Sequence, residues 1–339
     1  MDSATSTTAP DALPDAPLRP PAHRRAAGWF AALLLVIPTV VVACRVMDTD
    51  AATPIPQLLA FLPWLLIPAG AALLLMLLAR WRTGMVWAVI VLGVTGWFVR
   101  PYDSGLAEDP GGRAIAQFDV LTSNVEFGNA TQGLIATIQR EQPDLVFVQE
   151  CAAQCSDALE SEISPAEYPY RHVIEGSMAI GSAILSKYPL QRAPGIQSTM
   201  AMPGAVAVIS GVRVNIQLAH PLPPIPSGVD DWRRELELMR EYAVEAKGQP
   251  TLVAGDFNAS QDHAAFRRIM ADGDLQNSSA LGGASRTPSW PTAVGRPLGT
   301  QIDHVLVSEE FSVRKARFLE LGNTDHRSLL VRLDLHEAN

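Results

Sequence analysis

The chain has 339 residues, of which 48 % are hydrophobic, and a formal net charge of −9. The hydrophobic excess lies in the first hundred residues, so the chain combines a membrane part with a globular part. Residues 1–113 contain equal numbers of basic and acidic side chains, so the whole negative charge lies after them. An acidic domain argues against a protein that tracks nucleic acid, since neutralising phosphates requires clustered Lys and Arg, but it does not exclude an enzyme with a local basic cleft or a bound metal.

Three long apolar runs follow a polar tail rich in Ala, Pro, Ser and Thr, which we expect to be disordered and cytoplasmic over residues 1–25. The runs cover residues 26–44, 58–79 and 83–99. Each is near the ~20 residues that a helix needs to cross a bilayer. A cleaved signal peptide is the alternative for the first run, but two more runs follow and no small-x-small cleavage site leads into a polar start. We therefore expect three transmembrane helices.

Basic residues indicate the orientation of these helices. They precede the first helix and separate the second from the third, whereas the loop between the first and second contains Arg45 with Asp48 and Asp50. The positive-inside rule then places the N-terminus in the cytoplasm and everything after the third helix outside. Residues 100–113 form a Pro/Gly linker, so we expect residues 114–339 to be an extracytoplasmic domain of a multi-pass protein in the cytoplasmic membrane.

Short apolar runs alternate with helical patterns in this domain, which predicts a mixed α/β fold. The expected strands cover residues 118–123, 144–149, 182–186, 205–210, 212–218, 251–254, 303–308 and 328–333, and the expected helices cover residues 132–141, 230–246 and 264–270. The two strands that flank Gly211 indicate a hairpin. Trp232, Leu236, Met239 and Ala243 recur at helical spacing, so we expect them in the core.

The most informative segment is TLVAGDFNAS at residues 251–260. Its first four residues predict a buried strand, and Gly255 ends the apolar run. Because side chains alternate in an extended segment, Asp256 and Asn258 are expected on one face while Phe257 points into the core. A carboxylate and an amide there could hold a water and a phosphate oxygen. The alternative is a plain turn, since Gly, Asp and Asn are turn residues.

Polar residues follow the ends of other expected strands as well. Taken singly, each has an ordinary explanation as a turn residue, a helix-terminal carboxylate, a surface histidine or a solvated pair. Strand ends are nevertheless where sites form in α/β domains, and so many in one domain indicate an active site. The candidate residues are Asn124, Glu150, His220, Asp256, Asn258, Asp303, Asp325 and His326.

Seven segments resemble, in chain order, motifs of the endonuclease/exonuclease/phosphatase superfamily over about residues 115–335. They are LTSNVEFGN, PDLVFVQE, GSAILSKYPL, NIQLAHPLPP, AGDFNAS, IDHVLVS and GNTDHRSLLVRL. The three-helix N-terminus and the HPLPP segment further resemble the membrane-anchored, VanJ-like teicoplanin-resistance branch. The resemblance implies a DNase I-like four-layer α/β sandwich, in which two mixed β-sheets are flanked by helices and the site lies at one edge.

The resemblance also implies a divalent metal, Mg²⁺ with Mn²⁺ as an alternative. Glu150 would be its principal ligand, with Asn124 and Asp325 close to the ion. One or two carboxylates with several waters are normal for Mg²⁺. The extra acid that nucleases of the superfamily place between the Glu150 and His220 motifs has no counterpart here.

The remaining candidates receive catalytic roles from the same resemblance. Asp256 would orient or deprotonate the attacking water, and Asn258 would hold that water or a phosphate oxygen. His326, oriented by Asp303, would donate to the phosphoryl oxygens. His220 matches the second histidine of the superfamily. The implied reaction is metal-assisted in-line hydrolysis, in which positioning and charge stabilisation supply most of the rate.

Two cysteines follow the expected metal ligand on the side that should be oxidising. The four-residue spacing of Cys151 and Cys155 is compatible with a metal pair, a disulfide or two buried thiols. Zinc is disfavoured because no His or further Cys lies nearby in the sequence. We expect a disulfide, since extracytoplasmic thiols usually pair.

Three functions are compatible with this sequence. The first is a phosphatase acting on a lipid-linked, undecaprenyl-type pyrophosphate at the outer leaflet, with a role in cell-wall carrier recycling and glycopeptide resistance. The second is an anchored extracellular nuclease or phosphodiesterase, and the third is a non-catalytic sensor or adaptor. The intact acidic and histidine residues disfavour the third, and the acidic domain disfavours the second. We therefore expect the bilayer and a lipid-linked phosphate as partners, nucleic acid only under the second function, and no protein partner.

Overall fold

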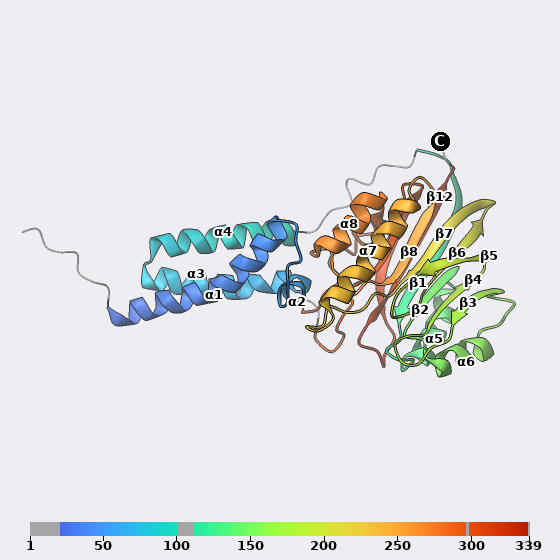
Figure 1. Cartoon of the computed structure of the whole chain (residues 1–339), viewed down its shortest axis with the longest axis horizontal. Helices are drawn as coiled ribbons and strands as arrows, with labels where there is room; N and C mark the ends of the chain where they lie inside the picture. The colour runs from blue at the N-terminus through green and yellow to red at the C-terminus, as the bar shows by residue number, and fades with distance from the viewer. Residues whose placement is uncertain (1–20, 101–110, 296–297, 338–339) are drawn as a thin grey trace, which may run out of the picture.

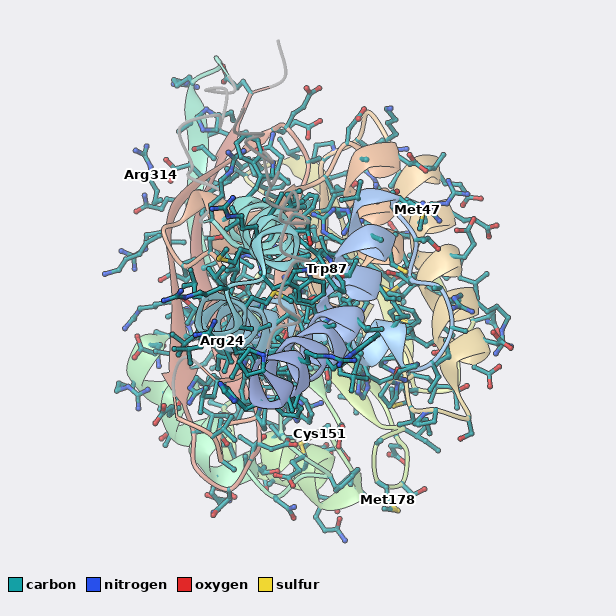
Figure 2. The ribbon with its side chains drawn as sticks, turned by 90° about the vertical axis from the view of Figure 1, so that its left-hand side faces the viewer. Arg24, Met47, Trp87, Cys151, Met178 and Arg314 are labelled. Atoms are coloured by element: carbon teal, nitrogen blue, oxygen red, sulfur yellow. A yellow bond between two sulfur atoms is a disulfide. The ribbon has the colours of Figure 1, made fainter. Side chains whose placement is uncertain are left out.

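A computed structural model describes residues 21–100, 111–295 and 298–337 (Figure 1). Residues 1–20 of the expected tail (1–25) and residues 101–110 of the expected linker (100–113) lie outside the described residues. Figure 1 shows an elongated molecule in which a bundle of helices is attached end-on to a β-sandwich. Figure 2 looks onto the free end of the bundle, where Arg24 lies, and shows that the sandwich extends beyond the helices on all sides.

The bundle contains α1 (Ala22–Val46), α2 (Ile55–Ala60), the 3₁₀ turn η1 (Leu62–Leu65), α3 (Leu66–Ala79) and α4 (Arg82–Val99). Among the described residues, three helical stretches are long and apolar enough to cross a membrane: Ala22–Val46, Leu62–Ala79 and Arg82–Val99. Small side chains let the helices approach closely, as in membrane bundles: Ala31, Ala69, Ala72 and Ala88 are all fully buried.

The span predicted as one run at residues 58–79 is broken. Phe61 separates α2 from η1, with φ −111° and ψ 31°, outside helical geometry. The break falls just before Pro63, which has no amide hydrogen to bond back into the last turn of α2. The first helix begins at Ala22 instead of residue 26 and extends two residues further than expected.

The first six-stranded sheet has the order β11-β12-β1-β2-β4-β3. Its strands are β1 (Ala114–Asn124), β2 (Leu145–Gln149), β3 (Tyr170–Ile174), β4 (Ser182–Ser186), β11 (Phe311–Glu320) and β12 (Arg327–His336). β1 and β2 are parallel, and the other pairs are antiparallel. Helices α5 (Thr131–Glu141) and α6 (Ala153–Glu162) cover its outer face, where Leu134, Ile138 and Leu159 pack with the sheet.

The second six-stranded sheet has the order β5-β6-β7-β8-β10-β9. Its strands are β5 (Leu190–Ile196), β6 (Met202–Ile209), β7 (Val212–Ala219), β8 (Thr251–Asp256), β9 (Gln276–Asn277) and β10 (Asp303–Val307). Helices α7 (Val229–Glu245) and α8 (Ala264–Gly273) cover its outer face, and α9 (Ser278–Leu281) follows β9. The predicted stripe of Trp232, Leu236, Met239 and Ala243 is buried there, which confirms its place in the core.

The two sheets pack face to face through apolar side chains such as Phe118, Val120, Ile216, Leu252 and Val305. The resulting layers are helix, sheet, sheet and helix, which confirms the predicted fold. Four strands, β3, β5, β9 and β11, were not predicted. Each lies at or next to a sheet edge, where one face meets solvent, so their sequences lack a continuous apolar run.

The bundle contacts the sandwich directly. The carboxylate of Asp50, from the loop after α1, accepts the backbone N–H groups of Ala264 at 2.7 Å and Ala265 at 2.9 Å. These are the first two amides of α8, which have no partner within their own helix. His263 adds a contact at 2.8 Å between its Nε2 and the backbone oxygen of Pro56. The active-site end of the sandwich is therefore fixed against the end of the bundle.

Candidate active site

The eight candidate residues meet around one pocket of about 620 Å³, at the end of the sandwich that contacts the bundle. Six of them line it: Glu150, His220, Asp256, Asn258, Asp325 and His326. The other two, Asn124 and Asp303, lie behind the lining and are hydrogen-bonded to it. Residues spread over 203 positions of the chain thus share one site because the strands of both sheets end there.

Asn124, the last residue of β1, links the two sheets. Its amide nitrogen donates to Oε1 of Glu150 at 3.0 Å and to Oδ2 of Asp256 at 3.2 Å. Its oxygen accepts the backbone N–H of Glu126 at 2.9 Å. Two carboxylates from different sheets therefore share one neutral donor, an arrangement that leaves negative charge for a cation to balance.

Asp256 ends β8, and the chain turns directly after it. Its Oδ1 accepts the backbone N–H of Asn258 at 2.8 Å, and Asn258 has a φ of +46°. The segment is therefore an Asx turn and not the extended chain expected from the sequence. The side chain of Asn258 donates to the backbone oxygen of Pro221 at 2.9 Å. Phe257 is fully buried, as predicted.

His326 is held by Asp303, the first residue of β10. Nδ1 of the ring lies 2.9 Å from Oδ2 of Asp303, and Nε2 lies 3.7 Å from Oδ2 of Asp256, too far for a hydrogen bond. Burial alone would lower the pKa of His326, but the carboxylates of Asp303 and Asp256 outweigh it and raise that pKa. Burial raises the pKa of Asp256, against the attraction of His326. The ring is therefore a cationic donor whose Nε2 faces the pocket.

His220 is fully buried. Within the described part of the chain neither of its ring nitrogens has a hydrogen-bond partner, and Nε2 lies 3.8 Å from Oε1 of Glu150. Burial lowers the pKa of His220 to about 3, and the charge on His326 adds to this shift. A neutral ring with unsatisfied nitrogens is costly in a folded protein, so it fits a position that meets a ligand.

The structure adds two residues that sequence reasoning missed, and both hold Asp325. Glu126 accepts the backbone N–H of Asp325 at 3.0 Å, and Trp290 donates its indole N–H to Oδ2 of Asp325 at 2.7 Å. Glu126 lies two residues after the candidate Asn124, so its position in the sequence could have identified it. Trp290 lies in the loop between α9 and β10, far from any strand end, so no comparable signal pointed to it.

Four of the thirteen described residues other than glycine that have a positive φ lie at this pocket. Glu126, Phe127, Glu150 and Asn258 have φ values of +45°, +58°, +57° and +46°, a region that residues other than glycine seldom adopt. All four line the pocket. Such conformations persist only where the surrounding structure enforces them, and they gather at functional sites.

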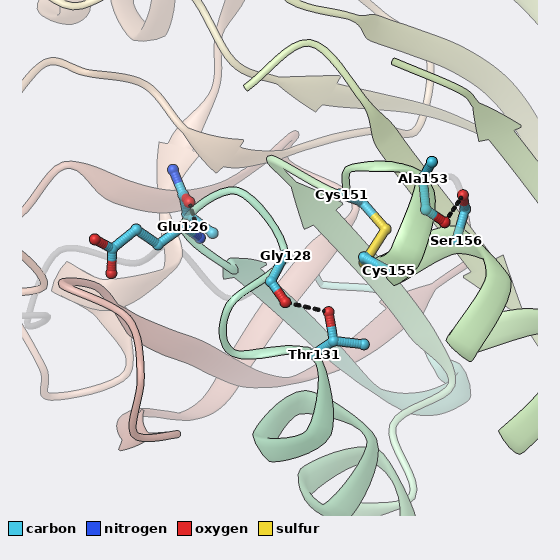
Figure 3. The surroundings of a disulfide bond; sticks show 8 residues. Glu126, Gly128, Thr131, Cys151, Ala153, Cys155 and Ser156 are labelled. Carbon is cyan, nitrogen blue, oxygen red and sulfur yellow. Dashed lines mark hydrogen bonds between the residues drawn. A yellow bond between two sulfur atoms is a disulfide. The ribbon is translucent and has the colours of Figure 1, made fainter. Parts of the chain in front are cut away.

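The predicted disulfide between Cys151 and Cys155 is present, with 5.1 Å between the two Cα atoms (Figure 3). It lies directly after Glu150 and faces Gly128, where an added Cβ would come within 3.4 Å of the Cβ of Cys155. The bond thus closes the turn between Glu150 and α6, and this turn packs against the loop that contains Glu126. Cys44, in α1, is a free buried thiol.

The pocket is polar at its base and apolar on its walls. Besides the acids and histidines, its lining includes Phe61, Phe127, Met200, Leu222, Ile225 and Trp290. Three lining residues, Gln57, Ala60 and Phe61, belong to the bundle, on α2 and at its end. The site is therefore built jointly by the sandwich and the helical bundle.

The base of the pocket suits a divalent cation. The carboxylates of Asp256 and Asp303 lie in one group with His326, with side-chain atoms within 4.8 Å of one another, and Oδ1 of Asp303 is buried without a partner among the described residues. The cationic ring of His326 is not a ligand, so the carboxylates would supply the metal-binding oxygens. Glu150, paired with Asn124, provides another carboxylate at the same place. Carboxylate and amide oxygens are the ligands that hard cations such as Mg²⁺ prefer.

Comparison with known proteins agrees with this geometry. Residues 121–326 match the family described as Endonuclease/Exonuclease/phosphatase family. No curated protein matches the sequence.

Among solved structures, D. rerio TDP2 humanised by 14 mutations is similar with a TM-score of 0.53 and 14 % identity, covering 64 % of this chain and 98 % of that one. D. rerio TDP2 complexed with single-strand DNA product has a TM-score of 0.53 and 13 % identity, covering 64 % and 99 %. An endonuclease/exonuclease/phosphatase family protein from Bacteroides thetaiotaomicron has a TM-score of 0.48 and 16 % identity, covering 66 % and 99 %.

Proposed function

We propose a function for this chain, which belongs to the endonuclease/exonuclease/phosphatase family. It hydrolyses a lipid-linked pyrophosphate of the undecaprenyl type at the outer face of the cytoplasmic membrane. Members of this family are metal-dependent hydrolases of phosphoric esters, which sets the reaction class. The lipid substrate is our proposal, as are the roles in carrier recycling and in glycopeptide resistance that the VanJ-like motifs of the sequence suggested.

The residues around the pocket divide the reaction between them. Asp256 accepts a proton from the attacking water, whose oxygen bonds to the terminal phosphorus. Cationic His326, held by Asp303, donates through Nε2 to a phosphoryl oxygen and stabilises the charge that develops there. The bond from phosphorus to the bridging oxygen breaks, and the products are inorganic phosphate and the lipid monophosphate.

Glu150, with Asn124 and Asp325 nearby, would hold the divalent metal, which supplies charge neutralisation and polarises the phosphoryl group. Neutral His220 would bind a further substrate oxygen, since its nitrogens are otherwise unsatisfied. Mg²⁺ is the ion we propose, with Mn²⁺ as a substitute. These ligands and roles are the ones that the sequence motifs implied.

One observation supports a lipid substrate most directly. The pocket that contains the acids and histidines has apolar walls, and residues of the membrane part complete it. A nuclease site needs an open basic surface along which a nucleic acid backbone can lie. The net charge of −9 and the apolar mouth of this pocket fit an uncharged hydrocarbon chain better.

The test is metal-dependent phosphate release by the full-length protein in detergent. Wild type and Asp256→Asn are compared on undecaprenyl pyrophosphate, undecaprenyl phosphate, and single- and double-stranded DNA. We expect phosphate release from the pyrophosphate by the wild type and its near-complete loss in the variant. Efficient cleavage of DNA without phosphate release from either lipid would replace this function with the nuclease.

The proposed location has its own test. The basic residues at the free end of the bundle support a location of the sandwich on the opposite, outer side. Alkaline phosphatase fused after Arg113 should therefore be active in cells. Activity of a reporter that works only in the cytoplasm, fused at the same residue, would contradict the orientation.

A further inference from the structure

The segment between the first two membrane spans forms part of the active site. Gln57, Ala60 and Phe61 lie on α2 and at its C-terminal end, where the break at Phe61 interrupts the apolar run. The ring of Phe61 lies 6.2 Å from that of Trp290, which in turn holds Asp325. Phe61 of the membrane part is thus separated from Asp325, at the polar base of the pocket, by the side chain of Trp290 alone.

The opposite wall is the loop from Leu222 to Pro226, which is rich in proline and leads into α7. Gln57 donates its side-chain amide to the backbone oxygen of Pro224, so the two walls are joined. Ile225 on this loop is 53 % exposed, and Phe127 on a neighbouring loop is 44 % exposed. Large apolar side chains therefore stand at the mouth of the pocket, where a water-soluble substrate would favour polar ones.

The size of the pocket limits what it can hold. About 620 Å³ is typical of a site for one small ligand, so a pyrophosphate head and the first part of a long prenyl chain fill it. The rest of such a chain must lie elsewhere. The spans that continue from this wall expose Leu74, Leu78 and Ile90 to the surroundings, which offers the remaining hydrocarbon a path along lipid-facing helices.

We propose that the α2–η1 segment, residues 55–65, is the binding wall for the first isoprene units of the substrate and that Ala60 and Phe61 determine specificity for prenyl chain length. This inference rests on the proposed function. It goes beyond anchoring: the membrane part selects the substrate as well as holding the enzyme at the bilayer. Because Phe61 lies beside Trp290 and the loop of Leu222–Pro226 lines the same pocket, the chain would pass between these two walls.

The experiment measures kcat/KM of the full-length protein for pyrophosphates with one, three and eleven isoprene units. Ala60→Trp should fill the part of the pocket beside this wall. It should therefore lower kcat/KM for three and eleven units about tenfold more than for one unit. Ala71→Trp is the matched control, because Ala71 lies exposed on α3 away from the pocket, and it should keep the wild-type ratios. Phe61→Ala, which removes the contact instead of blocking it, should lower the same ratios by about three- to tenfold.

Melting temperatures confirm that each variant is folded. An equal effect of Ala60→Trp and Phe61→Ala on all three chain lengths, in folded protein, would refute the wall while leaving the lipid pyrophosphatase intact. A wild type with no preference for longer chains would refute it as well. If the wild type released no phosphate from any of the three pyrophosphates, that result would refute the proposed function, and the proposed binding wall with it.

Discussion

Replacing Asp262 with alanine should weaken the attachment of the bundle to the sandwich. Asp262 is 1 % exposed, and its oxygens accept two hydrogen bonds from Arg286, at 2.7 and 2.9 Å. Its Oδ1 also lies 3.5 Å from Nε of Arg45, near the end of α1. Arg286 in turn donates to the backbone oxygen of Phe98 in α4. One carboxylate thus joins two helices of the bundle, α1 and α4, to the loop that follows β8.

The expected magnitude follows from burial. Removing one partner of a buried ion pair costs about 3–5 kcal/mol, because the opposite charge remains out of water, whereas an exposed pair contributes at most ~1 kcal/mol. At roughly 2–4 °C per kcal/mol, Asp262→Ala should lower the melting temperature by roughly 10 °C. Asp272→Ala is the matched control. Its carboxylate is 46 % exposed and pairs with Arg240 at 3.0 Å, so the shift should stay below about 3 °C.

The assay is thermal unfolding of the full-length protein in detergent, followed by tryptophan fluorescence. Asp262→Asn is measured alongside, because the amide keeps a hydrogen-bond acceptor without the charge, and it should fall between the alanine variant and wild type. A melting temperature of Asp262→Ala as close to wild type as that of Asp272→Ala would show that the buried charges do not hold the two parts together.

Four further predictions concern the site itself. Asp256→Asn should cut turnover by about 10²–10⁴-fold at an unchanged melting temperature, since a positioned base contributes that much, and a loss of only a few-fold in phosphate release would exclude it as the base. Glu150→Gln should raise the Mg²⁺ concentration needed for half-maximal activity, and a metal titration like that of wild type would remove it from the ligand set. Asp303→Asn should lower kcat about 10²-fold with little change in KM, because it acts through the histidine that it orients, so a change confined to KM would contradict this role. Joint replacement of Cys151 and Cys155 by serine should lower the free energy of unfolding by roughly 2 kcal/mol, and unfolding curves that coincide with wild type would show that the bond adds no stability.

Several features of this protein were accessible from local sequence. Apolar length predicted three helices that could cross a membrane, and alternation of short runs predicted a mixed sandwich. Buried central strands such as β2 and β8 were recognised because each consists almost entirely of apolar or β-branched residues. Edge strands such as β5 were missed, because one side of each is solvated and the pattern is then weak.

The candidate site was predictable to the extent that strand ends meet at one edge. Asn124, Glu150, Asp256 and Asp303 follow or begin strands of two sheets, and polar residues at such positions indicate a site before any coordinates are known. The chain could not show that Asn124 bridges the two carboxylates. That contact depends on the register and packing of two sheets, which local patterns do not specify.

The sequence by itself determined the family, the acids and histidines of the candidate site, and the length of the apolar helices, because each of these depends on residue type and local spacing. Only the tertiary structure decided what surrounds the chemistry. The turn at Asn258, the clamp of Trp290 on Asp325 and the place of Phe61 in the pocket wall all depend on segments far apart in the chain. Contacts of this kind are fixed by packing between whole elements, and a one-dimensional pattern does not contain them.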